Sequence, residues 1–333
     1  IFSRLMLDGR RPVVNGDGEQ ARDYVYVDDI VDAFARAGEI GGGVRLNIGT
    51  GIPTTVNELF GLIAEAAGYD SFVVPDSICY PEEADSRYPY NADGSREFLE
   101  DKPFIEPFSL IPALAAVTER IRFTTFVVKL PIRNPVIVAK QVTSVGVVTG
   151  GRFGFGVGTS PWREDYAVTG TPWERRGPRM DECMEIVAGL QSGDYFGYDG
   201  EFYSFDPIKL CPVPEPRVPV LVGGHSKLAL SRAARLGDGW MHGGGDAEEL
   251  ARMMTVITEQ RRELGKADDP FEVHAISLDA YTPDGIERLA AAGVTDVIVG
   301  FRDAYQPGPD TQTLDEKLTA LHWYADEVIS KVR

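Results

Sequence analysis

One short stretch restricts the fold of this chain more than any other. Residues 152–166 read RFGFGVGTSPWREDY, and apolar residues alternate with glycine from Phe153 to Gly158. Phenylalanine and valine favour a buried strand, while the glycines leave room for another backbone or a flat ligand. Pro161 prevents the strand from continuing, and the charged residues 163–165 indicate a turn at solvent. The pattern predicts a ligand site at the carboxyl edge of an α/β barrel, although a tightly packed strand without a ligand would produce it too.

The rest of the chain alternates short apolar runs with amphipathic segments, which is typical of repeated strand–helix units. The α/β fold class that this predicts is a (β/α)8 TIM barrel with insertion loops and an N-terminal appendage. Strands are expected near 44–48, 72–75, 121–128, 152–158, 218–223, 238–241, 271–277 and 295–300. Helices are expected near 107–118, 135–148, 176–191, 226–235, 246–265, 283–292 and 313–331.

The first strand–helix unit of the barrel is expected before residue 69. Residues 44–48 have alternating apolar positions, which favour a strand. Thr55 and Glu58 have the spacing of a capping box, which predicts that a helix begins there. We therefore expect an appendage over residues 1–43 and a barrel over residues 44–333, a length close to that usual for the fold.

Two segments are expected to interrupt the regular alternation. Residues 78–104 are polar and too long for an ordinary connection, and long loops are commonly lids or binding loops. Because this segment follows a strand, it should lie on the catalytic face. Residues 193–217 contain the pair Asp199-Gly200, which predicts a small hairpin.

Composition excludes several classes of partner. Lys+Arg of 33 against Asp+Glu of 51 gives a net charge of −18, which argues against nucleic acid. Three cysteines and four scattered histidines support neither a disulfide framework nor a metal site. No apolar run reaches the roughly 18 residues of a membrane span, and no secretory signal is visible. We therefore expect a cytoplasmic protein that binds no metal and no membrane.

Six blocks of sequence, in order, carry a resemblance that covers residues 68–333. The chain resembles the luciferase-like monooxygenase superfamily, a TIM-barrel group that uses flavin or the deazaflavin coenzyme F420. The LPIRNP and GGHS segments are most similar to actinobacterial F420-dependent oxidoreductases. The six blocks lie at 117–141, 152–166, 174–187, 199–205, 219–226 and 233–240.

Residues 1–68 resemble a different family. The segments NGDGEQARDYVYVDDIVDAFARA and LNIGTGIPTTVNELFGLIAEAAG look like the C-terminal part of an NAD-dependent sugar-nucleotide epimerase. In that family the arginine equivalent to Arg22 lies near the nucleotide-sugar. The chain has no Gly-rich dinucleotide fingerprint at its start, and none of its tyrosines is followed four residues later by lysine. An epimerase fragment without these parts cannot perform epimerase chemistry.

The GGHS segment is the expected site of a cofactor phosphate. Gly223, Gly224, His225 and Ser226 follow an expected strand and open a helix, so backbone N–H groups and the positive helix end would face an anion. A simple strand–helix turn capped by serine is the alternative. The resemblance implies that Trp240, in the next strand, lines the cofactor, although a core position would explain it equally well.

The resemblance also implies contacts with the cofactor ring. Thr125 and Phe126 match the third-strand bulge of the family, which often contains a non-prolyl cis peptide against the central ring. Gly158, Thr159 and Ser160 end the fourth expected strand, where the resemblance implies hydrogen bonds to the ring edge.

Asp76, at the end of the second expected strand, is the candidate acid or base. A carboxylate under an apolar ring can have its pKa raised by desolvation; the alternative is a cap for the following loop. Ser77, its candidate catalytic neighbour, stands where the sugar-phosphate branch of the family has histidine, and Pro161 where some F420 dehydrogenases have glutamate. The proton path should therefore differ from that branch. Trp162 and Tyr166 are expected to shape the substrate pocket, with packing as the alternative.

These features predict an F420-dependent oxidoreductase that transfers a hydride between deazaflavin C5 and a small carbonyl, alcohol or activated alkene. An FMN-dependent monooxygenase, served by a flavin reductase, is the enzyme alternative. A non-catalytic cofactor-binding barrel is the alternative from another class, and a sugar-nucleotide epimerase fragment is the third. The resemblance also makes a homodimer possible.

Overall fold

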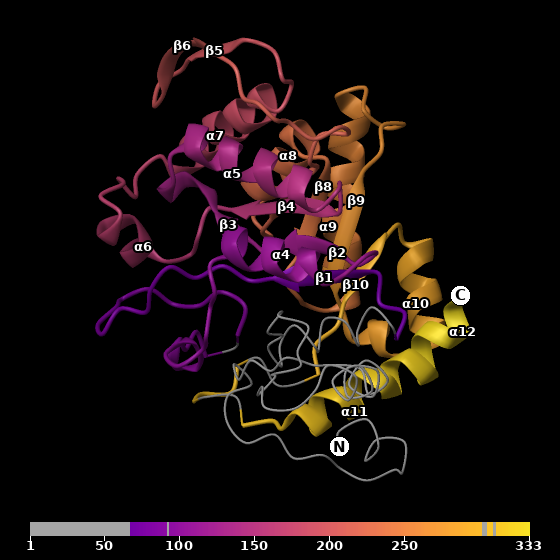
Figure 1. Cartoon of the computed structure of the whole chain (residues 1–333). Helices are drawn as coiled ribbons and strands as arrows, with labels where there is room; N and C mark the ends of the chain where they lie inside the picture. The colour runs from indigo at the N-terminus through magenta and orange to yellow at the C-terminus, as the bar shows by residue number, and fades with distance from the viewer. Residues whose placement is uncertain (1–66, 92, 302–304, 309–310) are drawn as a thin grey trace, which may run out of the picture.

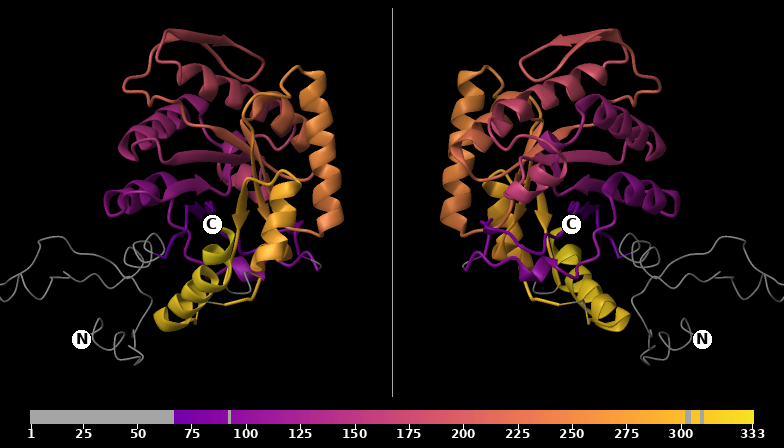
Figure 2. Two further views of the ribbon diagram at one scale, coloured as in Figure 1. Left: turned by 90° about the vertical axis from the view of Figure 1, so that its right-hand side faces the viewer. Right: turned by 90° about the vertical axis from the view of Figure 1, so that its left-hand side faces the viewer.

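The computed structural model describes residues 67–333 except residues 92, 302–304 and 309–310. Over this part of the chain, parallel strands form a nearly closed barrel with helices packed around it (Figures 1 and 2). The (β/α)8 fold expected from the sequence is confirmed. The expected strand at 44–48 and the expected appendage at 1–43 lie outside the described residues.

The barrel strands follow one another around the sheet in chain order. Neighbouring strands are parallel throughout, in the order β1-β2-β4-β7-β8-β9-β10, and β3 also pairs with β4. Because β2 and β3 pair with successive parts of β4, they occupy one position in the wall. The described part of the barrel therefore has seven wall positions. The strands are β1 (Ser71–Val74), β2 (Arg122–Thr125), β3 (Val128–Lys129), β4 (Phe153–Gly158), β7 (Val220–Gly223), β8 (Gly239–His242), β9 (Glu272–Ile276) and β10 (Asp296–Ile298).

The helices begin at side chains that satisfy their first backbone N–H groups. The Asn134 side chain accepts hydrogen bonds from two N–H groups at the start of α5, and Thr313 and Glu316 form a capping box before α11. The helices are α4 (Pro107–Ala116), α5 (Pro135–Val148), α6 (Arg163–Val168), α7 (Arg176–Leu190), α8 (Lys227–Leu236), α9 (Ala247–Glu263), α10 (Pro283–Ala291), α11 (Leu314–Tyr324) and α12 (Ser330–Val332). Shorter 3-10 turns are η1 (Glu97–Leu99), η2 (Leu130–Ile132) and η3 (Leu278–Tyr281), and the π-helical η4 (Ala325–Ile329) joins α11 to α12.

The glycines of β4 let neighbouring groups approach inside the barrel. A Cβ atom on Gly156 would lie 1.9 Å from the Thr125 carbonyl oxygen and 2.5 Å from the Met241 sulfur. The alternating Phe153 and Phe155 are fully buried, and Phe155 packs on Phe108 of α4 with ring centroids 5.9 Å apart. Tight packing therefore explains the interior part of this strand, as one of the two sequence interpretations proposed.

Both expected insertions are present. The antiparallel strands β5 (Phe196–Asp199) and β6 (Ser204–Ile208) form the hairpin predicted around Asp199-Gly200. The long segment 78–104 contains only the short turn η1 among its described residues. Its side chains contact residues that follow β4, β7 and β8, so the segment covers the carboxyl end of the barrel.

A half-buried polar network lies at the amino end of the barrel. The guanidinium of Arg122 donates to Glu272 (2.8 Å), whose carboxylate also lies 2.8 Å from His274 Nε2. Asp296 lies on the other side of the same ring nitrogen, at 3.4 Å. Burial alone raises the pKa of Glu272, but its bonds to His274 and Arg122 outweigh that effect and bring the pKa to about 2.

Among the residues that the structure describes, no helix is both long and apolar enough to cross a lipid bilayer.

Candidate functional site

The residues predicted to bind cofactor and substrate converge at one edge of the barrel. Parallel strands end on the same side, and β1, β2, β4, β7 and β8 each carry predicted residues at or just beyond their carboxyl ends. The residues brought to this edge are Asp76, Ser77, Thr125, Phe126, Gly158, Thr159, Ser160, Trp162, Gly223, Gly224, His225 and Ser226. Trp240 lies within β8 and Tyr166 within α6, and both side chains are buried.

The wall position formed by β2 and β3 is interrupted by a bulge. The peptide bond between Phe126 and Val127 is cis, at the bulge where the resemblance implied such a bond. The Val127 side chain lies against Gly158 and Gly223: a Cβ atom would come within 2.7 Å of it at Gly158 and 3.0 Å at Gly223. The Thr125 hydroxyl is buried and donates to the Gly156 carbonyl oxygen (2.8 Å). The glycines at the strand ends thus make room for Val127. Val127 was not among the site residues predicted from the sequence.

The turn after β7 is held in place from two sides. The indole N–H of the fully buried Trp240 donates to the Gly224 carbonyl oxygen (3.0 Å). The Ser226 hydroxyl accepts from the Ala229 N–H (3.2 Å) and so caps α8. Gly224 has φ of +118°, a conformation that favours glycine. Trp240 therefore supports the turn from the core, and the start of α8 opens at the carboxyl edge.

Two histidines form the floor of this region. His225 and His242 stack with ring centroids 4.5 Å apart and planes 11° apart. His225 Nε2 accepts from the Gly243 N–H (3.0 Å), which leaves the proton on His225 Nδ1. Burial lowers the pKa of His225. Burial and the neighbouring His225 lower the pKa of His242 to about 4.

His242 has one polar atom without a partner among the described residues. Its Nδ1 lies 3.2 Å from the Ile276 carbonyl oxygen and 3.4 Å from the Gly244 backbone nitrogen. The shorter contact, to an acceptor, favours the proton on Nδ1 and leaves Nε2 as a bare acceptor. That Nε2 atom is buried and makes no hydrogen bond within the described part of the chain. A buried polar atom without a partner is unusual and marks a place where a donor from a ligand or water fits.

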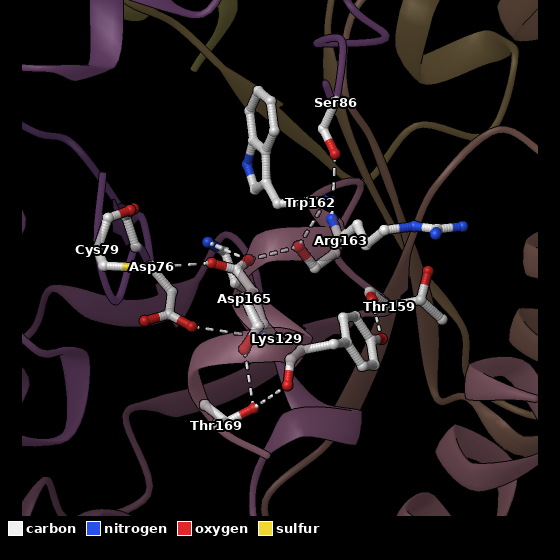
Figure 3. A network of polar contacts seen from close by, with 12 residues as sticks. Asp76, Cys79, Ser86, Lys129, Thr159, Trp162, Arg163, Asp165 and Thr169 are labelled. Atoms are coloured by element: carbon white, nitrogen blue, oxygen red, sulfur yellow. Dashed lines mark hydrogen bonds and ion pairs between the residues drawn. The ribbon is translucent and has the colours of Figure 1, made fainter. Parts of the chain in front are cut away.

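The loop after β4 is anchored by a buried ion pair (Figure 3). Lys129 Nζ lies 2.7 Å from Asp165 Oδ2, and both side chains are less than a tenth exposed. The Ser160 hydroxyl donates to the same carboxylate oxygen (2.6 Å) and accepts from the Trp162 N–H (3.0 Å). The expectation that residues 163–165 lie in solvent is wrong for Asp165, because this carboxylate turns inward to neutralise Lys129.

Tyr166 is also a supporting residue in this loop. Its side chain is 1% exposed, and its hydroxyl donates to the Thr159 carbonyl oxygen. Its ring packs edge-on against Trp173, with centroids 5.1 Å apart. Tyr166 is therefore a packing residue, which was the alternative to a role in the substrate pocket. Thr159 is half-buried, and its own hydroxyl makes no hydrogen bond within the described residues.

Asp76 is fixed in an ion pair beneath the same edge. Its carboxylate lies 3.0 Å from the Arg133 guanidinium and accepts from the Lys129 backbone N–H (3.0 Å). Its side chain is 1% exposed. The Ser77 hydroxyl is half-buried, 3.5 Å from the Cys79 carbonyl oxygen. Both oxygens of the Asp76 carboxylate accept hydrogen bonds from Arg133 or Lys129. This geometry favours a role for Asp76 in positioning β3 over a role in proton transfer.

Aromatic side chains of the long segment 78–104 close over the edge. Tyr88 stacks on Trp162 with centroids 5.7 Å apart and planes 15° apart. Tyr90 lies edge-on to His225, at 5.1 Å, and a Cβ atom on Gly243 would be 3.2 Å from its ring. Burial raises the pKa of both tyrosines. The segment thus partly covers the His225–His242 pair.

Sequence reasoning missed the ionic framework of the site. Lys129 and Arg133 fall within the block 117–141 that carried the resemblance, and Asp165 falls within the stretch after β4. Each was available as a charged residue beside a predicted strand end. The pairing itself could not be predicted, because it joins positions 36 and 57 residues apart that only the barrel brings together.

The strand order and the surrounding helices define a TIM barrel, and sequence comparisons give its family. A family profile described as luciferase-like monooxygenase matches residues 62–323, and one described as the NAD dependent epimerase/dehydratase family matches residues 1–49. The chain therefore belongs to the luciferase-like monooxygenase family, whose members are F420- or flavin-dependent oxidoreductases and monooxygenases.

Relatives match different parts of the chain. An uncharacterized protein of Mycobacterium tuberculosis strain H37Rv is 57% identical over 269 residues, 81% of this chain and 93% of that protein. An F420-dependent glucose-6-phosphate dehydrogenase of Nocardia farcinica is 31% identical over 176 residues, 50% of this chain and 52% of that enzyme. A UDP-glucose 4-epimerase of Mycolicibacterium smegmatis is 55% identical over 69 residues, 20% of this chain and 22% of that enzyme.

Solved structures with the same fold are distant in sequence. The monooxygenase RslO1 of Streptomyces bottropensis has a TM-score of 0.64 and 15% identity, covering 83% of this chain and 92% of its own. A coenzyme F420-dependent tetrahydromethanopterin reductase of Methanopyrus kandleri has a TM-score of 0.62 and 16% identity, covering 83% of this chain and 95% of its own.

The site residues fit a cofactor that carries a phosphate on a planar ring system. The start of α8 offers backbone N–H groups for a phosphate, and the bare buried acceptor at His242 Nε2 fits a hydroxyl or N–H donor elsewhere on such a cofactor. The Phe126–Val127 bulge presents a half-buried surface next to Gly158 and Gly223. Both F420 and FMN contain a ring system of this kind and a phosphate.

Proposed function

We propose that this chain is an F420-dependent oxidoreductase that transfers a hydride between deazaflavin C5 and a small organic substrate. The observation that carries the proposal is the anion cradle between β7 and β8, formed by Gly224, His225 and Ser226 at the start of α8. The F420-dependent enzyme of Nocardia farcinica, 31% identical over half of this chain, supports the deazaflavin over other phosphate-bearing cofactors.

The chain's own residues would bind and orient the cofactor. The bound deazaflavin supplies the hydride chemistry, and the barrel supplies orientation and electrostatics. His225 Nδ1–H and the N–H groups at the start of α8 would hold the phosphate, because both are donors at the positive end of a helix. Phe126 and Val127 would support the ring, and the Thr159 hydroxyl would donate to its edge.

The remaining residues would keep the site dry and rigid. The Lys129–Asp165 pair fixes the loop that carries Thr159, and Asp76, paired with Arg133, fixes the end of β3 through the Lys129 N–H. Stacking of Tyr88 on Trp162 would exclude water from the reacting face. The proton that accompanies hydride transfer would come from the substrate, from water or from an acid that these pairs do not include.

An FMN-dependent monooxygenase is the second candidate. It is favoured by the description of the matching family and by the shared fold of the RslO1 monooxygenase. The cradle would hold the phosphate of FMN in the same way. A cofactor-binding barrel without turnover is the third, and either cofactor would then bind without oxidation of a substrate.

Equilibrium titration tests the cofactor. Purified protein is titrated with F420 and, separately, with FMN, while the fluorescence of its four tryptophans is followed. Saturable quenching by F420 at lower concentration than by FMN supports the proposal and justifies a screen of carbonyl, alcohol and alkene substrates. Tighter binding of FMN, with oxygen consumed by the reduced complex, would move the assignment to the monooxygenase.

A matched pair of histidine variants tests the site. His225→Ala removes one donor to a charged group, and F420 affinity should fall about tenfold or more. His322→Ala, on the exposed side of α11, should leave affinity unchanged. Equal affinities of the two variants would place the cofactor elsewhere.

A further inference from the structure

Aromatic side chains gather on one side of the candidate site, beside the loop that follows β4. Tyr88 stacks on Trp162 with ring centroids 5.7 Å apart and planes 15° apart. Phe98 and Tyr305 also pack against Tyr88, with centroids 5.1 and 5.8 Å away. Burial raises the pKa of Tyr88, so its hydroxyl stays uncharged. These four residues form an uncharged surface of aromatic rings, called the aromatic cluster below.

Two neutral polar groups lie next to the aromatic cluster. A cavity of about 10 Å³, which has room for about one water molecule, is lined by Trp162, Ser77 and Cys79. The Ser77 hydroxyl makes only one long hydrogen bond within the described residues, at 3.5 Å, so it can bind a ligand. Burial raises the pKa of the Cys79 thiol, which therefore stays neutral. A hydroxyl and a thiol suit the oxygen of an alcohol or a carbonyl group.

The basic side chains of this region already have partners. Lys129 pairs with Asp165, and Arg133 pairs with Asp76 (Figure 3 shows the Lys129–Asp165 pair). Arg96 lines the cavity, but its two terminal nitrogens donate to backbone carbonyl oxygens of segment 78–104, at 2.6 and 3.1 Å. These three cations are therefore committed to the protein itself and do not offer a phosphate site.

The acidic side chains of the cavity act against an anionic ligand. Glu164 and Asp165 both line it. One carboxylate oxygen of Glu164 is buried and accepts no hydrogen bond within the described part of the chain. A phosphate or carboxylate brought next to Glu164 would meet a like charge in a partly desolvated place, which is unfavourable.

We infer that the substrate is an uncharged alcohol or carbonyl compound with a flat aromatic or conjugated body, and not a phosphate ester. The inference rests on the proposed function, because it places the reacting group beside the ring of a bound cofactor. A flat body between Tyr88 and Trp162 would exchange one ring contact for two. Since the cavity holds about one water molecule, segment 78–104 must move away from Trp162 to admit the substrate.

Calorimetric titration of the protein with matched alcohols tests the inference. The protein is first loaded with F420 or FMN, whichever it binds. Benzyl alcohol should bind about 2–10-fold more tightly than cyclohexylmethanol, which lacks the flat ring. It should bind about tenfold or more tightly than 4-(hydroxymethyl)benzoate, which adds a negative charge. Glucose 6-phosphate should show no saturable binding at concentrations at which benzyl alcohol saturates.

A matched pair of tryptophan variants locates the recognition. Trp162→Leu keeps an apolar side chain but removes the aromatic face, so the preference for benzyl alcohol over cyclohexylmethanol should vanish. Trp323→Leu, at a half-exposed position on α11, should keep the preference. Urea unfolding verifies that both variants are folded. The cofactor titration is repeated for both, so that lost cofactor binding is distinguished from lost substrate recognition.

Three results would overturn the inference. The first is equal affinity for benzyl alcohol and cyclohexylmethanol, and the second is tighter binding of either anionic probe. The third is a preference that persists in Trp162→Leu, because the flat body would then be recognised elsewhere. Heat of binding is measured without turnover, so these results are separate from the test of the proposed function, which fails if the cofactor titration shows no binding of F420.

Discussion

The Lys129–Asp165 pair should be the most sensitive ionic contact at the site. Both side chains are less than a tenth exposed, and the carboxylate also accepts from the Ser160 hydroxyl. In Asp165→Asn the buried ammonium loses its counter-charge, and removal of one partner of a buried pair typically costs about 3–5 kcal/mol. We expect the free energy of unfolding to fall by this amount.

A double variant separates the net value of the pair from the cost of an unpaired charge. Lys129→Met combined with Asp165→Leu removes both charges and keeps the volume apolar, so it should recover most of the loss seen in Asp165→Asn. The surface pair Arg175–Glu201 is the control, since both side chains are about half exposed. Glu201→Gln should cost no more than about 1 kcal/mol.

The assay is urea unfolding followed by circular dichroism and by tryptophan fluorescence. Coincident transitions allow a single free energy to be assigned, and an unchanged slope against urea indicates that stability alone has changed. A loss below about 1 kcal/mol in Asp165→Asn would refute the reasoning, because a buried unpaired ammonium cannot cost so little. A double variant less stable than Asp165→Asn would refute it as well.

Three further predictions concern protonation, access and positioning. His242 binds a proton less readily in the folded than in the unfolded chain, so stability should fall as the pH is lowered from about 6.5 toward 4. The loss between pH 7 and pH 5 should be about 1–2 kcal/mol by urea unfolding, and His242→Asn should reduce that slope, with His225 accounting for what remains. Tyr90→Ala removes an aromatic contact worth about 0.5–1.5 kcal/mol over the cradle, so stopped-flow association of F420 should accelerate about 2–10-fold; Tyr195→Ala, at an exposed site, should not accelerate it. Asp76→Asn should lower stability by about 3 kcal/mol yet leave the midpoints of the kcat pH profile unchanged, and a vanished midpoint would restore Asp76 as the acid or base.

Much of the fold could be predicted because each strand and helix has a local cause. Phe153 to Gly158 is apolar enough to form a buried strand, and Asn134 before Pro135 marks the start of α5. Helix and strand boundaries depend on such neighbouring residues, so a single sequence contains them.

The site was harder to predict because its geometry depends on contacts between distant residues. Trp240 and Gly224 belong to successive strand–helix units, and only the barrel brings the indole N–H to that carbonyl group. Asp165 was expected in solvent since its neighbours are charged, but its position inside the loop is decided by Lys129. The strand ends were therefore predictable, whereas the partner of each polar side chain was not.

The strand order has a consequence for how such a chain can be altered by recombination. Since the wall positions from β1 to β10 follow the chain order, each strand borders the units immediately before and after it. An exchange of sequence upstream of β1 therefore leaves the order and pairing of the described strands unchanged. These wall positions, and the pairs that shape the carboxyl edge, are inherited intact. A barrel of this order can acquire an unrelated N-terminal sequence through one genetic crossover, and the described strands keep the same neighbours.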